Sequence, residues 1–334
     1  MIDSIGTLYA GHIDLESVGF DSIPANDRTY SAEELNTVYA KAEAIAKVMD
    51  SNGYDILWMA EHHFQKEGYE CIPNVLMLAV HLAHLTKNIR IGCGFNVSPM
   101  WHPLRMAEDY ATAEILTNKR VVFGVGRGYH TREVESFGNP MLDGDANREL
   151  FEEQVDVMFK AFHSDSFSHV GENYVIPPEI PYRGYDLKEI TLVPRPLQRP
   201  VECWQPIVSA SERGLAFMAK HAIKGVIGGG AAPGGASENV IKEWQRVQSQ
   251  YGIETDLGGN LCIGFSFHIA DSEKQAIETT ILRTGSALFV SGLTTVSGFA
   301  VLFLSPMPLV RNFGIITAAT IVYSLIIAIF VLPS

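Results

Sequence analysis

The stretch of residues 89–125 reads IRIGCGFNVSPMWHPLRMAEDYATAEILTNKRVVFGV and contains one strand–helix–strand unit. Residues 89–95 form an apolar run that predicts a short buried strand, and residues 121–125 predict a second one. Between them, residues 103–116 predict a helix with proline in its first turn. Two buried strands joined by a helix are typical of a parallel sheet, so the unit predicts an α/β fold.

The same alternation continues on both sides of this unit. The other expected strands are residues 5–10, 54–60, 206–209, 225–227 and 261–269, and the other expected helices are residues 31–49, 75–85, 148–162, 212–221 and 238–251. A further helix is expected to begin near Asp271. Residues 163–203 are rich in Pro, Tyr and Gly, so they predict an excursion with a hairpin.

Seven strand–helix units at this spacing predict a (β/α)8 TIM-type barrel. A doubly wound open sheet is the alternative, but the glycine-rich turns lack the G-x-G-x-x-G spacing of dinucleotide-binding folds. The sequence after about residue 280 does not show the eighth strand–helix unit that a complete barrel needs. The barrel is therefore expected to be truncated after its seventh strand.

Charge and cysteines limit the function classes. Lys and Arg total 25 against 38 for Asp and Glu, a net charge of −13, which argues against a general nucleic-acid binder. From Thr284 to the end of the sequence, Arg311 is the single charged residue. The four cysteines show no C-x-x-C pair or zinc spacing, so we expect free thiols in a reducing compartment.

Polar residues follow three of the expected strands at the end where barrels carry their chemistry. Arg127 follows the fourth strand, and Ser209-Ala-Ser211 follows the fifth and leads into a helix. Free N–H groups at a helix start, serine hydroxyls and a forked guanidinium can together hold a phosphate. The alternative is that Ser211 only caps its helix and Arg127 only forms an ion pair.

The second strand ends in Glu61, His62 and His63. If the chain is extended here, the two histidines point in opposite directions, and one of them can face the barrel mouth. Two purely structural histidines are the alternative. No metal site is expected, because H-E-x-x-H is absent and the nearest other histidines, His81 and His84, lie on a separate helix.

Four motifs occur together in the order of a known family. They are Glu61-His62-His63-Phe64, PMWHPLRMAED at residues 99–109, KRVVFGVGRG at residues 119–128, and Phe137-Gly138. Over about residues 1–278 this pattern resembles the bacterial luciferase-like (LLM class) flavin-dependent monooxygenases. The resemblance implies a barrel that binds reduced FMN at its mouth and uses O2 to oxygenate an aldehyde, ketone, sulfonate or similar small molecule.

The resemblance also implies catalytic residues. His62 matches the catalytic histidine beside the flavin, as a general acid or base or a stabiliser of the oxygenated flavin. Glu61 and His63 match the rest of the motif that shapes the catalytic pocket.

The residues that the resemblance implies for cofactor binding are Arg127, Gly128, Tyr129, Ser209 and Ser211. A separate flavin reductase is the implied source of reduced FMN, and relatives are often homodimers. An oxidoreductase of the same fold that uses the deazaflavin F420 and moves hydride is the alternative.

Two uncharged apolar runs, residues 286–304 and 314–332, lie in the last part of the chain. Each approaches the roughly 20 residues that cross a bilayer, so residues 279–334 predict a transmembrane hairpin, with two buried core helices as the alternative. The tail resembles the last helices of a transporter half in the RND/MMPL superfamily. Because it contains no Asp or Glu, it carries no proton relay, and transport is not expected.

The junction near residues 279–283 therefore predicts a fusion. A working enzyme would keep its catalytic domain in the cytoplasm and be anchored to the inner (plasma) membrane by the hairpin. The alternative is an inactive chimera that contains a fragment of an RND/MMPL transporter, because a barrel without its eighth strand leaves strand edges open.

Overall fold

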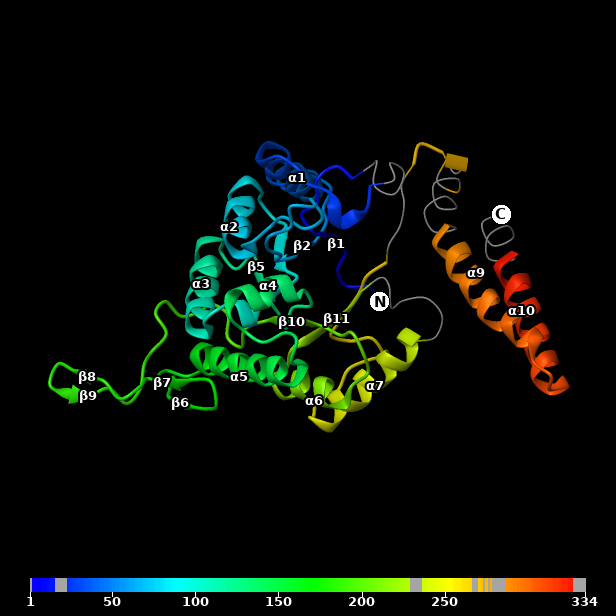
Figure 1. Ribbon diagram of the computed structural model, residues 1–334. Helices are drawn as coiled ribbons and strands as arrows, with labels where there is room; N and C mark the ends of the chain where they lie inside the picture. Colours follow the sequence, from blue (N-terminus) through cyan, green and yellow to red (C-terminus); the bar gives the residue numbers. More distant parts are fainter. Residues whose placement is uncertain are drawn as a thin grey trace. The chain divides into compact units, whose positions relative to one another are not determined.

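The computed structural model describes residues 2–15, 23–228, 236–265, 270–272, 274–275, 277 and 286–326 (Figure 1). The chain divides into two compact units, Met1–Phe265 and Ser266–Ser334.

The first unit is built on a parallel sheet. Its strands are β1 (Gly6–Tyr9), β2 (Ile56–Met59), β3 (Arg90–Cys93), β5 (Val121–Gly126), β10 (Cys203–Pro206), β11 (Lys224–Ile227) and β12 (Leu261–Ile263), which pair in this order. Every pair in the order is parallel, and the short strand β4 (Asn96–Val97) also pairs with β5. The seven parallel strands confirm the predicted sheet of a TIM-type barrel with seven strands.

Helices connect the strands and follow one another around them (Figure 1). They are α1 (Ala32–Ser51), α2 (Val75–Leu85), α3 (Pro103–Leu116), α4 (Thr131–Val134), α5 (Gly144–His163), α6 (Glu212–Lys220) and α7 (Ala236–Gln250). Short 3-10 turns lie at Ala25–Asp27, Ser98–Met100 and Glu135–Phe137. Ser31 and Glu34 form a reciprocal capping box that begins α1, because each side chain satisfies a backbone N–H of the other residue.

The core lies between the sheet and these helices. Leu57, Ile91 and Phe123 from successive strands are fully buried. The strands approach closely at Gly124, where a Cβ atom would lie 1.9 Å from the carbonyl oxygen of Cys93. A glycine is therefore required where β3 and β5 meet.

One strand begins earlier than its apolar residues suggest. The prediction of residues 206–209 is wrong by three residues, because β10 is Cys203–Pro206. The strand begins earlier because Cys203 and Trp204 already pair with Phe123 and Gly124 of β5. Beyond Pro206 the N–H of Ile207 still donates to Val226, whereas Val208 is 91% exposed. At the last strand, β12 ends at Ile263, and residues 266–269 lie outside the described residues.

The excursion contains two small hairpins instead of one. Strand β6 (His169–Val170) pairs with β7 (Val175–Ile176), and β8 (Pro181–Tyr182) pairs with β9 (Tyr185–Asp186), both antiparallel. The β8–β9 hairpin extends away from the rest of this unit (Figure 1).

The second unit contains an apolar helical hairpin. Helix α9 (Ser286–Ala300) continues as a 3-10 turn at Val301–Leu304, and α10 is Pro308–Ile326. The second span was expected to begin at residue 314, but the helix already begins at Pro308, because proline fits the first turn of a helix. Residues 327–332 of that expected span, and the junction at 279–283, lie outside the described residues.

The two helices of the hairpin pack through glycines. A Cβ atom at Gly292 would lie 2.8 Å from Leu325, and one at Gly314 would lie 2.8 Å from the carbonyl oxygen of Phe299. Among the described helices of the chain, α10 alone is long and apolar enough to cross a membrane. Small residues at such a crossing are common between membrane helices, where they let two backbones approach closely.

Glu202 ties three strand starts together at the end of the sheet away from the site. Its carboxylate accepts hydrogen bonds from Arg90 at 2.5 Å, Lys224 at 3.0 Å and the indole of Trp204 at 3.0 Å. Burial alone would raise the pKa of Glu202, but Arg90 and Lys224 outweigh it and lower the pKa to about 2.

A carboxyl group with a lowered pKa stabilises the fold above its unfolded pKa of about 4.3, and the effect is lost as the pH falls toward the folded value. We therefore expect Glu202→Gln to lower the free energy of unfolding at pH 7 by about 1–2 kcal/mol. The difference from the wild type should shrink between about pH 4.5 and 2. Urea unfolding followed by tryptophan fluorescence measures it. Glu172→Gln, at an exposed carboxylate in the β6–β7 turn, is the matched control. A difference that stays constant over this pH range would contradict the role of the ion pairs.

Candidate active site

The expected site residues lie in three loops that leave the same end of the parallel sheet. Glu61, His62 and His63 follow β2, residues 127–129 follow β5, and Ser209 and Ser211 follow β10. In a parallel barrel these loops surround the mouth, so the fold places the three groups at one end.

His62 is held by a buried carboxylate from α4. Its ring Nδ1 lies 3.1 and 3.2 Å from the two carboxylate oxygens of Glu133, and both side chains are buried. Glu133 also accepts hydrogen bonds from the backbone N–H of His63 and from the Gln65 amide, each at 3.0 Å. Burial by itself would raise the pKa of Glu133, but these hydrogen bonds outweigh it and lower the pKa below its usual value.

The charge of Glu133 determines which face of His62 is available for chemistry. A charged carboxylate accepts the Nδ1 proton, so the Nε2 atom is the one free to take up or release a proton. That atom lies 3.3 Å from the Tyr129 hydroxyl and 3.4 Å from Glu70. The arrangement can therefore hold a proton donor or acceptor at a defined position in the mouth.

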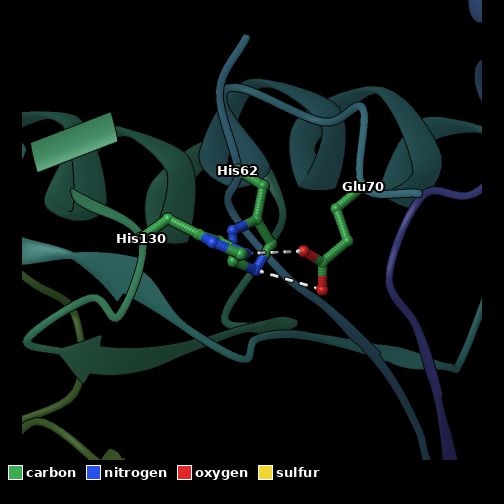
Figure 2. Close-up of side chains that lie close together, drawn as sticks. All are labelled: His62, Glu70 and His130. Carbon is green, nitrogen blue, oxygen red and sulfur yellow. Dashed lines mark ion pairs between the residues drawn. The ribbon is translucent and has the colours of Figure 1, made fainter. Parts of the chain in front are cut away.

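The Nε2 side of His62 is shared with two further residues. Figure 2 shows the rings of His62 and His130 side by side, both directed at the carboxylate of Glu70. His130 Nε2 lies 3.4 Å from Glu70, and the Tyr129 hydroxyl donates to the same carboxylate at 3.0 Å. Burial and the neighbouring Glu70 carboxylate raise the pKa of Tyr129, so its hydroxyl keeps its proton.

Glu61 and His63 lie on the other side of the motif. The buried Glu61 carboxylate accepts hydrogen bonds from the N–H of Val97 and the indole of Trp101, each at 2.7 Å, and contacts His63 Nε2 at 3.1 Å. Burial is the largest influence on Glu61 and raises its pKa against these hydrogen bonds. The ring of His63 packs against Phe137. Both residues therefore hold the loops of the mouth together, whereas His62 faces its polar interior.

Arg127 is tied to the start of α5. Its Nε atom donates to Asn147 at 2.9 Å and its Nη2 atom donates to the carbonyl of Gly144 at 2.7 Å. Burial and the neighbouring Arg148 lower the pKa of Arg127, and Arg213 at the first turn of α6 adds to this effect. Arg213 itself pairs with Glu152 at 2.8 Å, and Glu152 and Asp145 act on Arg127 in the opposite direction, so cations and carboxylates alternate around Arg127.

The serines are exposed beside that helix start. Ser211 is the N-cap residue of α6, yet its side chain accepts no hydrogen bond from the described N–H groups of the helix. Ser209 and Ser211 are both exposed, and within the described chain neither shares a hydrogen bond with Arg127. The start of α6 therefore keeps donors that an anion can use.

Gly128 follows Arg127 in a conformation that other residues rarely adopt. Its φ is +77°, and a Cβ atom there would lie 2.8 Å from Val97 and 2.9 Å from Val134. A larger residue would be strained and crowded, so glycine allows this loop to turn from β5 to Tyr129.

Three of these residues had no role in the expectations from sequence: Glu70, His130 and Glu133. They are separated from their partner His62 by loops, and the sequence pattern offers no spacing rule across loops. One usable signal is that His130 lies in the loop after the fourth strand; Glu133 lies further on, in α4. The sequence argument against a metal site rests on the absence of H-E-x-x-H and on the separate helix of His81 and His84, and it does not include His130.

Comparison with known proteins identifies the first unit. The family model described as luciferase-like monooxygenase matches residues 18–299, and the model of the MMPL family matches residues 268–334. Both resemblances expected from the sequence are thereby confirmed.

Curated relatives are similar over part of their length. The chain is 26% identical over 174 residues to the oxygenase component of flavin-dependent trigonelline monooxygenase from Acinetobacter baylyi, which covers 52% of this chain and 44% of that protein. It is 28% identical over 151 residues to the alkanal monooxygenase alpha chain of the Kryptophanaron alfredi symbiont, covering 45% of this chain and 41% of that protein. The chain thus spans less than half the length of these curated relatives.

Solved structures share the fold. The oxygenating constituent of 3,6-diketocamphane monooxygenase from Pseudomonas putida, in complex with FMN, has a TM-score of 0.63 at 18% identity and covers 83% of this chain and 70% of that chain. The coenzyme F420-dependent tetrahydromethanopterin reductase from Methanopyrus kandleri has a TM-score of 0.57 at 15% identity and covers 85% and 72%. Because the family model matches well over half of the sequence, this chain belongs to the luciferase-like monooxygenase family.

Proposed function

We propose that this chain is a flavin-dependent monooxygenase that uses reduced FMN and O2 to oxygenate a small organic substrate. The observation that carries the proposal is the hydrogen-bonded pair of His62 and Glu133 between the loops that follow β2 and β5. A buried carboxylate that fixes one ring nitrogen of a histidine and leaves the other facing a mouth is suited to general acid–base catalysis.

The residues of the mouth fit a flavin with a phosphate tail. The N-terminus of α6, with the exposed Ser211 and the guanidinium groups near it, offers donors for a phosphate. Apolar side chains also stand exposed beside the strand ends: Phe64 is 55% exposed, and Val208 is 91% exposed. An apolar, planar ring system would cover such side chains and remove them from water.

Each proposed role follows from these positions. A bound reduced flavin would supply the electrons that activate O2 for oxygen transfer to the substrate. His62 Nε2 would take up or release the proton of the reaction, and Glu133 would keep the ring in the required tautomer. Arg127, Ser209 and Ser211 would hold the phosphate, and Gly128 and Tyr129 would line the path between phosphate and His62.

Some solved structures with the same fold belong to F420-dependent enzymes. Hydride transfer with F420 is therefore the second candidate. The two candidates are separated by binding. We expect the purified full chain, kept in mild detergent, to bind FMN or FMNH2 more tightly than F420 in a fluorescence or absorbance titration. Oxygenation should require reduced FMN from an added flavin reductase or from photoreduction. If folded protein binds neither FMN nor FMNH2, the main proposal is refuted. Binding of F420 alone would support the second candidate.

We also propose that the second unit attaches the enzyme to the inner membrane, with the catalytic unit in the cytoplasm. The apolar helix α10 and the match of residues 268–334 to the MMPL family support this proposal. We expect the full chain to stay in the membrane pellet after carbonate extraction at high pH, because a spanning helix is held by buried apolar surface. Release into the supernatant would refute the anchor.

A further inference from the structure

Two histidines and a carboxylate converge at the mouth of the first unit. One ring nitrogen each of His62 and His130 and one carboxylate oxygen of Glu70 lie within 4.8 Å of one another. Each histidine Nε2 lies 3.4 Å from Glu70, His62 from one carboxylate oxygen and His130 from the other (Figure 2). The three groups come from two loops, after β2 and after β5, so the fold assembles them.

The two nitrogen–oxygen separations of 3.4 Å match those between metal ligands. Ligand atoms about 2.1 Å from a tetrahedral ion lie about 3.4 Å from one another, and zinc takes its nitrogen and oxygen ligands at about this distance. Two histidines and one carboxylate also form a common donor set of zinc sites that keep one position open. The cluster therefore has the size and the composition of such a site.

A buried neighbour orients one of the three groups. Glu133 is completely buried and contacts His62 Nδ1, which holds the ring with its Nε2 atom toward Glu70. A carboxylate on the far nitrogen of a ligating histidine fixes its tautomer and raises its basicity. This contact is the second, independent feature that favours an ion at the cluster.

The cluster is also accessible and carries the right charge. The side chain of His62 is 6% exposed, that of Glu70 is 22% exposed and that of His130 is 38% exposed, so an ion can enter from the solvent. Glu70 and Glu133 place two carboxylates next to the two rings, which favours a cation there. The hydrogen bonds of the Tyr129 hydroxyl to Glu70 would be displaced by the ion.

We propose that His62, Glu70 and His130 bind a divalent transition-metal ion of the zinc class. The ion would bind to the Nε2 atom of His62, to which the proposed function assigns proton transfer. On that proposed function, metal binding would inhibit oxygenation reversibly. Binding of the ion itself does not depend on a flavin, and it is tested without one.

The test uses the full chain, stripped of metal and titrated with Co²⁺ and with Zn²⁺. We expect visible d–d absorption bands of bound Co²⁺, which Zn²⁺ removes in a 1:1 ratio, and a Zn²⁺ binding isotherm by calorimetry. His130→Ala and Glu70→Gln should each weaken binding by at least about 10-fold, and Glu133→Gln by about 10- to 100-fold. Circular dichroism verifies that each variant is folded.

The matched control is His81→Ala, since His81 is an exposed histidine that also contacts a carboxylate, Glu43, at 2.9 Å. It should leave Co²⁺ and Zn²⁺ binding unchanged. Absence of Co²⁺ bands in the folded wild type, or equal losses in His81→Ala and His130→Ala, would overturn the proposal. A chain that binds Co²⁺ but shows no oxygenation in its metal-free form would support the metal site while refuting the proposed function. A metal-free chain that oxygenates but does not bind Co²⁺ would do the reverse.

Discussion

His62→Ala is expected to reduce oxygenation by about 10²- to 10⁴-fold, which is the usual contribution of a positioned acid–base group. The reason is that Nε2 of His62 is the ring nitrogen on the side of Tyr129, while Nδ1 is held by Glu133. The affinity for FMN should change much less, because the phosphate donors lie after β5 and β10. Single-turnover product formation with FMNH2, O2 and a panel of aldehydes and ketones measures the rate, and a fluorescence titration measures the affinity.

Two variants make this prediction specific. Glu133→Gln should lower the rate by less than His62→Ala, because the ring stays but its tautomer is no longer fixed, and the pH profile of the rate should shift. His81→Ala, on the surface of α2, is the control and should keep the wild-type rate. Equal losses of rate and of FMN affinity in His62→Ala would argue against a catalytic role.

Arg127→Ala is expected to weaken FMN binding by about 1.5–3 kcal/mol, or about 10- to 150-fold in Kd, because a hydrogen bond to a charged phosphate is lost. Riboflavin, which lacks the phosphate, should lose little affinity on the same substitution. The ratio of the two losses, measured by flavin fluorescence with the full chain, isolates the phosphate contact.

The control for this prediction is Arg105→Ala. Arg105 is an exposed arginine on α3 that pairs with Asp109 at 2.9 Å. Its removal should leave both affinities unchanged. Because Arg127 also donates to Asn147 and Gly144, near-UV circular dichroism must show that Arg127→Ala keeps the native packing. Equal losses of FMN and riboflavin affinity would show that Arg127 supports the loop rather than the phosphate.

Much of the fold was predictable because its signals are local. Helices α2 and α3 begin and end where the sequence predicts, since Asn74 and His102 cap them and the apolar periodicity continues between the caps. The predicted position of β10 is wrong because an apolar run marks buried residues. The limits of a strand depend instead on which backbone groups pair. Cys203 and Trp204 pair with β5 ahead of the apolar run, and within the described chain only one further hydrogen bond of the ladder, from Ile207 to Val226, follows Pro206.

The site was predictable only in part. His62, Arg127 and Ser211 stand out because each follows a strand, and parallel strands end on the same side of a sheet. Glu133 and Glu70 do not stand out, because 71 residues separate Glu133 from His62 and the loop path sets where Glu70 falls. Glu133 and Glu70 belong to the site because their side chains meet that of His62 across the mouth.

The sequence by itself determined the order of strands and helices, the luciferase-like motifs and the uncharged apolar tail, because periodicity and charge are properties of neighbouring residues. Only the tertiary structure decided that His62 faces Glu133, Tyr129, Glu70 and His130 while Glu61 and His63 support the loops. The physical reason is that hydrogen bonds and ligand distances are set over 3–4 Å between loops. Alternation along one strand determines only that adjacent side chains diverge.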